Sequence, residues 1–537
     1  MADVSSRERA TDALRSAGVL RRAGLFRPAR PDESLRSLLS IRRYGPFAGA
    51  MRIAAQREPD SLGLVDDLGT LTFTQLDRRS NALARAWQGH GITAGDVVGL
   101  LCRNHRGFLD TLFACGKIGA RTVLLNTGFS ARQLADVAAR EGVSVMVYDQ
   151  EFAPIVAAMP ALVGRYLAWV DVPMSADVPS VESLIVTTDD DDVAPPRTAA
   201  GMVLLTSGTT GTPKGAPREV RSPLGAAEFL DRVPYRRREA TMIGAPLFHG
   251  TGMSQLIVTL ALASTTVLAR RFDPGITLGR IHQLRCTAAV LVPTMLQRIL
   301  DMGPAVLSRY DTASLRIILC AGSAISPDLG NRTMRAFGPV LYNLYGSTEV
   351  AVATVATPQD WRRAPGTVGK PPVGCRVRLY DDHDKPVKRP YQRGRIFVGS
   401  GLQFSGYTGG GSKEEIDGLL STGDVGHLDA NGLLFIDGRA DDMIISGGEN
   451  VYPGEVENLL VEHPAVREAA VVGVPDPAYG QRLKAYLVLE PGAWLDPAQV
   501  QQYVRANLAR FKVPRDIAYL TDLPRNPTGK LLRHLLP

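Results

Sequence analysis

The chain has 537 residues, of which 45% are hydrophobic and 21% charged. This length exceeds that of an ordinary single domain, so we expect a multi-domain protein with sizeable buried cores. The formal net charge of +7 is small for such a chain, and neither a long basic run nor an RNA-binding aromatic cluster accompanies it. These features argue against a nucleic-acid-binding protein.

The cysteines and the apolar runs bear on the cellular compartment. The five cysteines lie far apart and form no Cys-x-x-Cys pair, so we expect neither a disulfide framework nor a structural zinc site. Apolar runs fall short of the roughly 18 residues of a membrane span, and residues 1–10 are too polar for a signal peptide. We therefore expect a cytoplasmic protein.

Residues 1–45 form a candidate N-terminal arm that is rich in arginine. Ten Arg stand against five acidic residues, a net charge of +5, with apolar side chains between them. A basic amphipathic segment of this kind is suited to peripheral contact with an anionic membrane surface. The alternative, a solvated arm folded over the main domain, is the more common case.

Strand and helix patterns alternate from residue 64 onward. A helix is expected after residue 74, with Thr74 and Asp77 as a pair resembling a capping box. Strands are predicted at 97–101, 123–125, 143–148, 202–205 and 340–344. The predicted helices between them include 108–118 and 133–140. Such alternation predicts an α/β fold with a largely parallel sheet.

The pattern changes near residue 437. Short antiparallel strands are expected at 395–398 and 432–436, before a polar, Gly-rich stretch. The expected elements after it are a helix at 454–462, strands at 469–474 and 485–489, and a helix at 497–508. We therefore expect a large domain over residues 46–437 and a small α+β domain over residues 438–537.

A loop rich in Gly and Thr follows the predicted strand at 202–205. Its sequence is Thr206-Ser207-Gly208-Thr209-Thr210-Gly211-Thr212-Pro213-Lys214-Gly215. Glycines allow backbone N–H groups to approach an anion closely, hydroxyls add donors, and Lys214 adds a cation, so the loop suits a polyphosphate. It is not a Walker A loop, because Gly215 rather than Ser or Thr follows Lys214.

This loop resembles the signature loop of the adenylate-forming superfamily, which comprises acyl- and aryl-CoA synthetases, peptide-synthetase adenylation domains and luciferases. Four further segments resemble the family's motifs and occur in the family's order. They are Tyr345-Gly346-Ser347-Thr348-Glu349, Ser421-Thr422-Gly423-Asp424, Gly438–Asp442 with Ser446–Asn450, and Pro524–Lys530. Five motifs in order make a chance match improbable.

The resemblance implies a fold and a reaction. The implied fold is a large N-terminal domain of sheets flanked by helices with a distorted β-barrel, followed by a small mobile C-terminal domain. The implied reaction joins a small-molecule carboxylic acid to ATP, giving an acyl-adenylate and pyrophosphate, and a thiol then displaces AMP. Bringing a carboxylate to a polyphosphate requires Mg²⁺ and fixed cations.

The resemblance also implies a role for each matching residue near the nucleotide. Glu349 is the expected Mg²⁺ ligand, since hard cations take oxygen ligands, and Thr348 is expected to bind the α-phosphate. Asp424, with Arg439 as its partner, is expected to accept hydrogen bonds from the ribose hydroxyls. The expected adenine contacts are stacking by Tyr345 and the edge formed by Gly322, Ser323 and Ala324.

Other matching residues would serve catalysis and domain movement. Lys530 is expected to bridge the carboxylate and the α-phosphate during adenylate formation, and Asp441 matches the family's hinge. Gly448 falls where the pantetheine arm would pass. His249 matches the gate between the acyl site and that tunnel, although a lone His is often structural.

The sequence indicates the acid substrate and the acyl acceptor less clearly than it indicates the nucleotide site. The expected acyl pocket lies near Met253, Gln255, 293–294, Ala321 and 350–354, and its small residues favour a medium- or long-chain fatty acid over acetate. Another carboxylic acid, such as an aryl acid, is the alternative. Coenzyme A is the favoured acceptor, because residues 446–453 resemble CoA synthetases and no carrier domain follows Lys530. Transfer to a carrier protein stays open, and a non-catalytic binding protein is least favoured.

Overall fold

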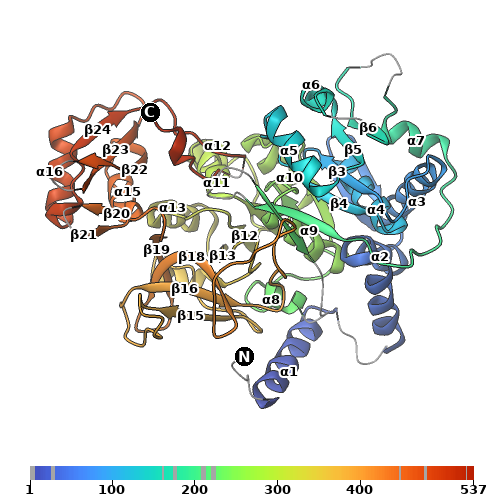
Figure 1. Ribbon diagram of the computed structural model, residues 1–537, viewed down its shortest axis with the longest axis horizontal. Helices are drawn as coiled ribbons and strands as arrows, with labels where there is room; N and C mark the ends of the chain where they lie inside the picture. The colour runs from blue at the N-terminus through green and yellow to red at the C-terminus, as the bar shows by residue number, and fades with distance from the viewer. Residues whose placement is uncertain are drawn as a thin grey trace.

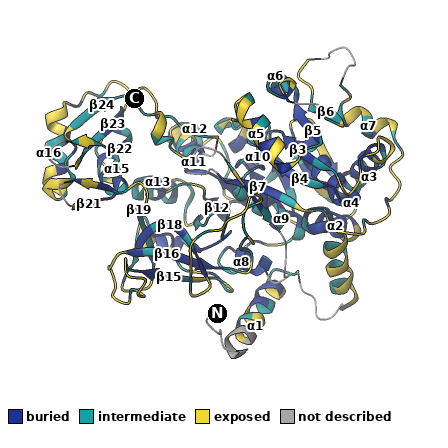
Figure 2. Cartoon of the chain, in the orientation of Figure 1, coloured by how far each residue is buried: buried dark blue, intermediate teal, exposed yellow. Residues whose placement is uncertain are grey.

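The computed structural model describes residues 6–25, 31–159, 162–172, 178–206, 213–218, 225–446, 449–476, 480–527 and 529–537. Two large α/β sheets and an antiparallel sheet form the body of the molecule, and a small C-terminal domain lies at one end (Figure 1). Both large sheets are mostly buried, as Figure 2 shows. The expected α/β fold with a small C-terminal domain is confirmed.

The first large sheet carries the phosphate-loop hairpin. Its strands run in the order β6 (Gly164–Trp169), β5 (Val145–Asp149), β3 (Val97–Leu101), β4 (Arg121–Leu124), β7 (Met202–Thr206) and β8 (Lys214–Arg218). All neighbours are parallel except β7 and β8, which are antiparallel. The helices of this region are α3 (Phe73–Gly89), α4 (Arg106–Ile118), α5 (Ala131–Glu141), α6 (Ala153–Ala157) and α7 (Val181–Thr187).

The second large sheet has antiparallel pairs at its two edges and parallel pairs between them. Its order is β14 (Thr354–Ala356), β13 (Leu341–Tyr345), β12 (Ile317–Cys320), β11 (Ala288–Leu291), β9 (Ala240–Ile243), β10 (Thr265–Leu268), β1 (Leu62–Asp66) and β2 (Gly69–Thr72). The associated helices are α8 (Ala226–Leu230), α9 (Gly250–Ala261), α10 (Pro274–Leu284), α11 (Pro293–Leu300), α12 (Pro304–Leu307), α13 (Pro327–Phe337) and α14 (Pro358–Arg363).

Two smaller sheets complete the fold. The antiparallel sheet consists of β15 (Arg376–Tyr380), β16 (Gly394–Gly399), β17 (Glu415–Ile416), β18 (Leu419–Leu428) and β19 (Leu434–Arg439). The C-terminal sheet consists of β20 (Ile444–Ser446), β21 (Glu449–Val451), β22 (Val466–Asp476), β23 (Gly480–Leu489) and β24 (Asp516–Tyr519), with helices α15 (Pro453–Val461) and α16 (Pro497–Asn507). Its apolar residues form a core of their own.

The N-terminal segment is helical and partly packed on the body. Helix α1 (Ser6–Arg22) buries Val19 and Leu20 against α8. Helix α2 (Pro31–Arg57) runs across the predicted boundary at residue 45 and kinks there, where Gly45 has φ 78° and Pro46 follows. Within the described residues, no helix combines the length and apolarity needed to cross a bilayer. The boundaries at residues 45 and 437 stay predictions.

The start of α3 differs from the sequence expectation. The cap is Thr72, whose hydroxyl accepts from the N–H of Gln75 while the Gln75 side chain accepts from the N–H of Thr72. The expected pair, Thr74 and Asp77, lies two residues too late, and Thr74 donates its hydroxyl hydrogen to the carbonyl of Pro59 instead. Thr72 takes the cap because its backbone is still extended as the last residue of β2.

Candidate active site

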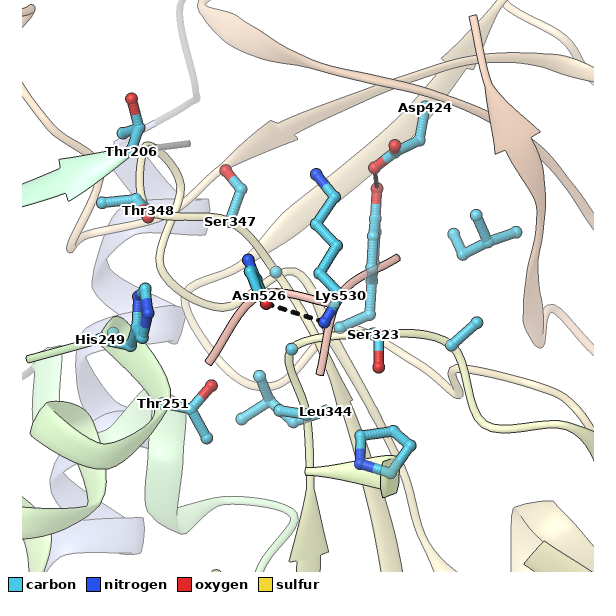
Figure 3. Close-up of a pocket in the computed structure, with 18 of the residues that line it drawn as sticks. Thr206, His249, Thr251, Ser323, Leu344, Ser347, Thr348, Asp424, Asn526 and Lys530 are labelled. Carbon is cyan, nitrogen blue, oxygen red and sulfur yellow. Dashed lines mark hydrogen bonds between the residues drawn. The ribbon is translucent and has the colours of Figure 1, made fainter. Parts of the chain in front are cut away.

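A large cavity lies between the body and the C-terminal domain. Its volume is about 1980 Å³, and its walls come from both large sheets, the β18–β19 hairpin and the Asn526–Lys530 loop. Figure 3 shows Thr206, Thr348, Asp424 and Lys530 around one space. Segments separated by more than three hundred residues in sequence therefore meet here.

The phosphate loop is anchored by the β7–β8 hairpin at the cavity wall. Thr206 ends β7 and pairs with Lys214, the first residue of β8. The buried Thr206 hydroxyl donates to the Lys214 carbonyl across 3.2 Å, so both ends of the loop are held together. The predicted phosphate-binding residues Ser207, Gly208, Thr209, Thr210 and Gly211 lie outside the described residues.

Glu349 is buried, and a tyrosine holds its carboxylate in place. The residue follows β13, at the carboxyl end of a strand, where α/β sheets bind ligands. The Tyr407 hydroxyl donates to Glu349 Oε1 across 2.8 Å, and Lys214 Nζ lies 5.2 Å from the centre of the Tyr407 ring. Thr348, next to Glu349, lines the same cavity. A carboxylate fixed in this way, beside a lysine, fits a hard divalent cation bound to a polyphosphate.

Asp424 and Tyr345 form a hydrogen-bonded pair on the opposite wall. The Tyr345 hydroxyl donates to Asp424 Oδ2 across 2.5 Å, and Arg439 Nη1 lies 3.5 Å from Oδ1. Burial raises the pKa of Asp424, although the Tyr345 hydrogen bond and the charges of Arg439 and Lys530 oppose this. Gly322, Ser323 and Ala324 line the cavity, and Gly322 adopts φ 98°. Stacking of Tyr345 on adenine stays a prediction.

Lys530 reaches the cavity from a tight loop of the C-terminal domain. Its N–H donates to Asn526 Oδ1 across 2.9 Å, and its carbonyl accepts from the N–H of Asn526. Gly529 has φ 77°, and a Cβ on it would lie 2.3 Å from Thr294 Oγ1 of α11, so glycine permits both the turn and the close docking. The Lys530 side chain extends between Ser347 and Asp424 (Figure 3).

His249 caps the start of α9 and lines the cavity. Its Nε2 is buried and has no hydrogen-bond partner within the described part of the chain. Burial lowers the pKa of His249 to about 4, so the imidazole is neutral near pH 7. The residue thus brings a neutral imidazole with an unpaired, buried nitrogen to the cavity wall.

The predicted hinge follows β19. Arg439 links this hinge to the body of the protein. Its Nε lies 2.9 Å from Asp441 Oδ1, and its Nη1 faces Asp424. Asp441 is exposed and lies between β19 and β20. The other residue expected to act after domain movement, Gly448, lies outside the described residues.

Comparison with known families identifies the chain. The family model described as AMP-binding enzyme matches residues 51–408, and the model of the AMP-binding enzyme C-terminal domain matches residues 455–530. The chain belongs to the AMP-binding enzyme family. The resemblance to adenylate-forming enzymes drawn from the motifs is thereby confirmed.

Known relatives of this AMP-binding enzyme act on several kinds of acid. Feruloyl-CoA synthase from an Amycolatopsis species is 35% identical, with 86% of this chain and 92% of the relative covered. The fatty acid–[acyl-carrier-protein] ligase ScoC of Streptomyces coeruleorubidus is 32% identical, with 90% and 94% covered.

A solved relative shares the architecture of this AMP-binding enzyme. The o-succinylbenzoate CoA synthetase of Bacillus subtilis, solved with ATP and a magnesium ion, has a TM-score of 0.77 at 28% identity, with 91% of this chain and 98% of that chain covered. Together, the relatives support an acid–CoA ligase that uses ATP. They do not single out fatty acids.

The acyl side of the cavity differs in part from the expected pocket. Met253, Pro293, Thr294, Ala321 and Ala351 line the cavity as expected. Gln255 does not face it, because its side chain is buried and accepts a hydrogen bond from the Tyr235 hydroxyl across 2.8 Å. The other expected residues, Val350, Val352, Ala353 and Thr354, are buried as well.

Tyr407 and Asn526 are site residues that the sequence reasoning missed. Tyr407 lies 58 residues from the carboxylate it contacts, and this AMP-binding enzyme's sequence alone gives no sign of that pairing. Asn526 belongs to the motif at residues 524–530, but the motif predicts no role for it. Its position four residues before Lys530 in a Pro/Gly-containing loop is a usable signal, because Asn side chains often close such turns.

Proposed function

We propose that the enzyme activates a carboxylic acid with ATP as its acyl-adenylate and transfers the acyl group to coenzyme A. The observation that carries this proposal is the extension of Lys530 into the cavity, beside Asp424 and across from Thr348, with Glu349 in the lining of the same cavity. A lysine in such a place serves a reaction between two anions, and the β7–β8 hairpin next to it suits a polyphosphate.

In the first half-reaction, a carboxylate oxygen of the acid attacks the α-phosphorus, and the bond to pyrophosphate breaks. The Lys530 ammonium lies between the two anionic groups and reduces their repulsion, while Thr348 donates to the α-phosphate. Glu349, oriented by Tyr407, is the group that would hold Mg²⁺. When bound, Mg²⁺ would neutralise phosphate charge.

In the second half-reaction, the thiol of CoA attacks the acyl carbon and AMP leaves. Lys530 is not needed to stabilise charge in this step, so the C-terminal domain is free to turn about Asp441 and bring Gly448 toward the acyl group. The mixed anhydride formed first supplies the driving force for the thioester. Transfer to a carrier protein is the alternative, favoured by the similarity to ScoC.

We favour a medium- or long-chain fatty acid as the substrate, with an aryl acid as the alternative. The support for a fatty acid is the largely apolar acyl side of the cavity, with Met253, Ile257 and Phe229 in its lining. The similarity to feruloyl-CoA synthase favours an aryl acid. Both substrate classes share an apolar body and one carboxylate.

A screen of acids tests the proposed function. Pyrophosphate release is measured with acetate, octanoate, palmitate, benzoate and ferulate, each with and without CoA. We expect acid-dependent release that CoA increases, together with formation of the acyl-CoA. Release that no acid stimulates would contradict the proposal, and a thioester formed on a holo-carrier protein but not on CoA would reassign the acceptor.

We also propose that the first half of α2 contacts anionic membrane surfaces. Leu35, Leu38 and Leu39 are exposed at helical i, i+3, i+4 spacing, with Arg42 and Arg43 one turn later. Binding to anionic vesicles should weaken with salt and be lost in Leu35→Glu/Leu38→Glu. Leu68→Glu, at an exposed leucine outside α2, is the matched control. Equal vesicle binding by all three proteins would refute this contact.

A further inference from the structure

We infer that the end of the cavity enclosed by α2, α4 and β7 is a binding subsite for the apolar tail of the acid. This inference rests on the proposed function and adds a substrate class to it: acids whose tail is long enough to pass α9 and reach the N-terminal helix. None of the family motifs in the sequence falls in this part of the cavity.

The cavity extends far beyond the groups that handle the phosphates. Its lining continues to Tyr44, Pro46 and Phe47 of α2, Leu112 of α4 and Met202 and Leu204 of β7. Its volume of about 1980 Å³ exceeds the roughly 300–1,000 Å³ typical of small-molecule sites. Part of this volume belongs to the cleft at the C-terminal domain, where Arg467, Asp522 and His534 also line it, so the apolar lining near α2 rather than the total volume marks this end as a subsite.

Helix α9 provides a path from the reacting carboxylate to this end. His249 precedes the helix, and Ser254 and Ile257 line the cavity further along it. From Gly250 to Ile257 the helix rises about 10 Å, so a substrate tail must be elongated to follow it to α2. Helices α2 and α9 pack against each other, so the path ends at the walls of the subsite.

The kink in α2 shapes the far wall. Gly45 has φ 78° and ψ 175°, a conformation that favours glycine, and Pro46 lacks the N–H that a continuous helix would use. The helix resumes against α4, where a Cβ on Gly116 would lie 2.5 Å from Ala48 Cβ. Thus the two helices touch at Gly116, while Tyr44, Pro46 and Phe47 at the kink face the cavity.

The chemistry of these walls suits a hydrocarbon. The charged groups that neighbour them are already paired: Arg52 Nη1 lies 2.8 Å from Asp192 Oδ1, and Lys117 Nζ lies 2.6 Å from Asp77 Oδ1. The Arg52 guanidinium also lies 4.8 Å from the centre of the Tyr44 ring. Apart from Thr122 of β4 and the hydroxyl of Tyr44, the lining side chains here are aromatic or aliphatic, so burial of methylene groups is the main interaction that this end offers.

The substitution Ala200→Phe tests the subsite. Ala200 lines the cavity next to the kink, since a Cβ on Gly45 would lie 3.4 Å from its carbonyl oxygen. Both Ala200 and Ala199 lie in the coil before β7, and Ala199 is exposed and outside the cavity lining. Ala199→Phe is therefore a control of the same size, one residue away.

The measurement is kcat/KM for CoA ligation of linear acids from hexanoate to palmitate. For the wild type we expect a rise of about fourfold per added methylene until the subsite is full. In Ala200→Phe the palmitate-to-octanoate ratio should fall by about fifteenfold, the effect of two methylenes losing contact. Ala199→Phe should keep the wild-type ratio. Using a ratio makes the result independent of a loss of folded protein.

Two results would overturn the inference while leaving the proposed function intact. One is an unchanged ratio in Ala200→Phe. The other is a wild-type enzyme that ligates benzoate or ferulate to CoA but gains nothing from a longer linear chain. If no acid at all is ligated, the proposed function fails, and the subsite inference fails with it.

Discussion

Glu349 is a carboxylate whose orientation is fixed before any ligand binds. The Tyr407 hydroxyl occupies one side of Oε1, and the residue follows directly on a strand and turn that line the cavity. Preorganisation of this kind spares the site a reorganisation cost when a cation arrives. A test of its role must therefore separate the charge of the carboxylate from its geometry.

The substitution Glu349→Gln keeps the shape of the side chain and removes its charge. We expect the Mg²⁺ concentration for half-maximal activity to rise by at least about tenfold, with a lower kcat. Tyr407→Phe leaves the charge and removes the orienting donor, so its shift should be smaller. The check is a Mg²⁺ titration of pyrophosphate release, and overlapping titration curves for Glu349→Gln and the wild type would move the metal ligand elsewhere.

Glu228 is a second buried carboxylate, located in α8 away from the phosphates. Its Oε1 accepts from the N–H of Gly401 across 2.7 Å, while Oε2 has no partner within the described residues. Burial raises the pKa of Glu228 from 4.5 to about 7. The folded protein therefore holds this proton more tightly than the unfolded chain, and stability is lost as pH rises from about 4.5 to about 7.

The substitution Glu228→Gln should relieve this cost. Gln keeps an oxygen for the Gly401 N–H and carries no charge, so the variant should unfold at a higher temperature than the wild type at pH 8. The gain in the free energy of unfolding is at most about 3 kcal/mol, and it should vanish near pH 4.5. The measurement is the unfolding temperature of the variant and the wild type at pH 8 and at pH 4.5. A gain of the same size at both would assign the effect to packing.

At the level of elements, local patterns predicted the strands and helices well and contacts poorly. The strand at 97–101 was predicted with its exact ends as β3 because its apolar run is bounded by polar residues. The start of α3 was predicted two residues late, because Thr72 and Thr74 both make acceptable caps and the end of β2 decides between them. Local sequence carries no such information.

Local sequence also failed to predict which side chains of the site contact one another. Motif order placed Lys530, Asp424 and Glu349 in one site, and all three line the cavity. The motifs did not predict Tyr407 as the partner of Glu349, nor the turning of Gln255 into the core toward Tyr235. Each of these depends on which face of an element meets another, and that is set by packing between distant segments.

The connection between β19 and β20 is the element on which domain movement depends. Proline at residue 441 would fix φ near −65° and restrict Ala440, so Asp441→Pro should hold the C-terminal domain near one orientation. We expect acid-dependent pyrophosphate exchange to persist while CoA-dependent turnover collapses. Asp441→Ala removes the contact with Arg439 without restricting the backbone and serves as the control.

Measurement of both half-reactions on the folded variants tests this claim. If Asp441→Pro lost the two activities equally, or if Asp441→Ala showed the same split, the hinge assignment would be wrong. The corresponding substitution Gly448→Leu, designed from the sequence to obstruct the thiol, should give the same pattern as Asp441→Pro.

In the molecule as a whole, the C-terminal domain completes a cavity whose other walls belong to the body. The Asn526–Lys530 loop docks through Gly529 against Thr294. The charge of Lys530 acts to lower the pKa of both Asp424 and Asp441. Under the proposed mechanism, this is the orientation expected for adenylate formation. The mechanism also predicts a second orientation of the C-terminal domain for thiol attack, because the Asn526–Lys530 loop would otherwise stay in the cavity.

Lys530→Ala, assayed in each half-reaction separately, tests this central claim most directly. The account predicts that acid-dependent exchange of pyrophosphate into ATP falls by about 10²–10³-fold, because a charge-stabilising donor is lost where two anions meet. Conversion of supplied acyl-adenylate to acyl-CoA should stay at the wild-type rate. Adenylate formation at the wild-type rate in Lys530→Ala, or equal loss of both half-reactions in folded protein, would contradict the account.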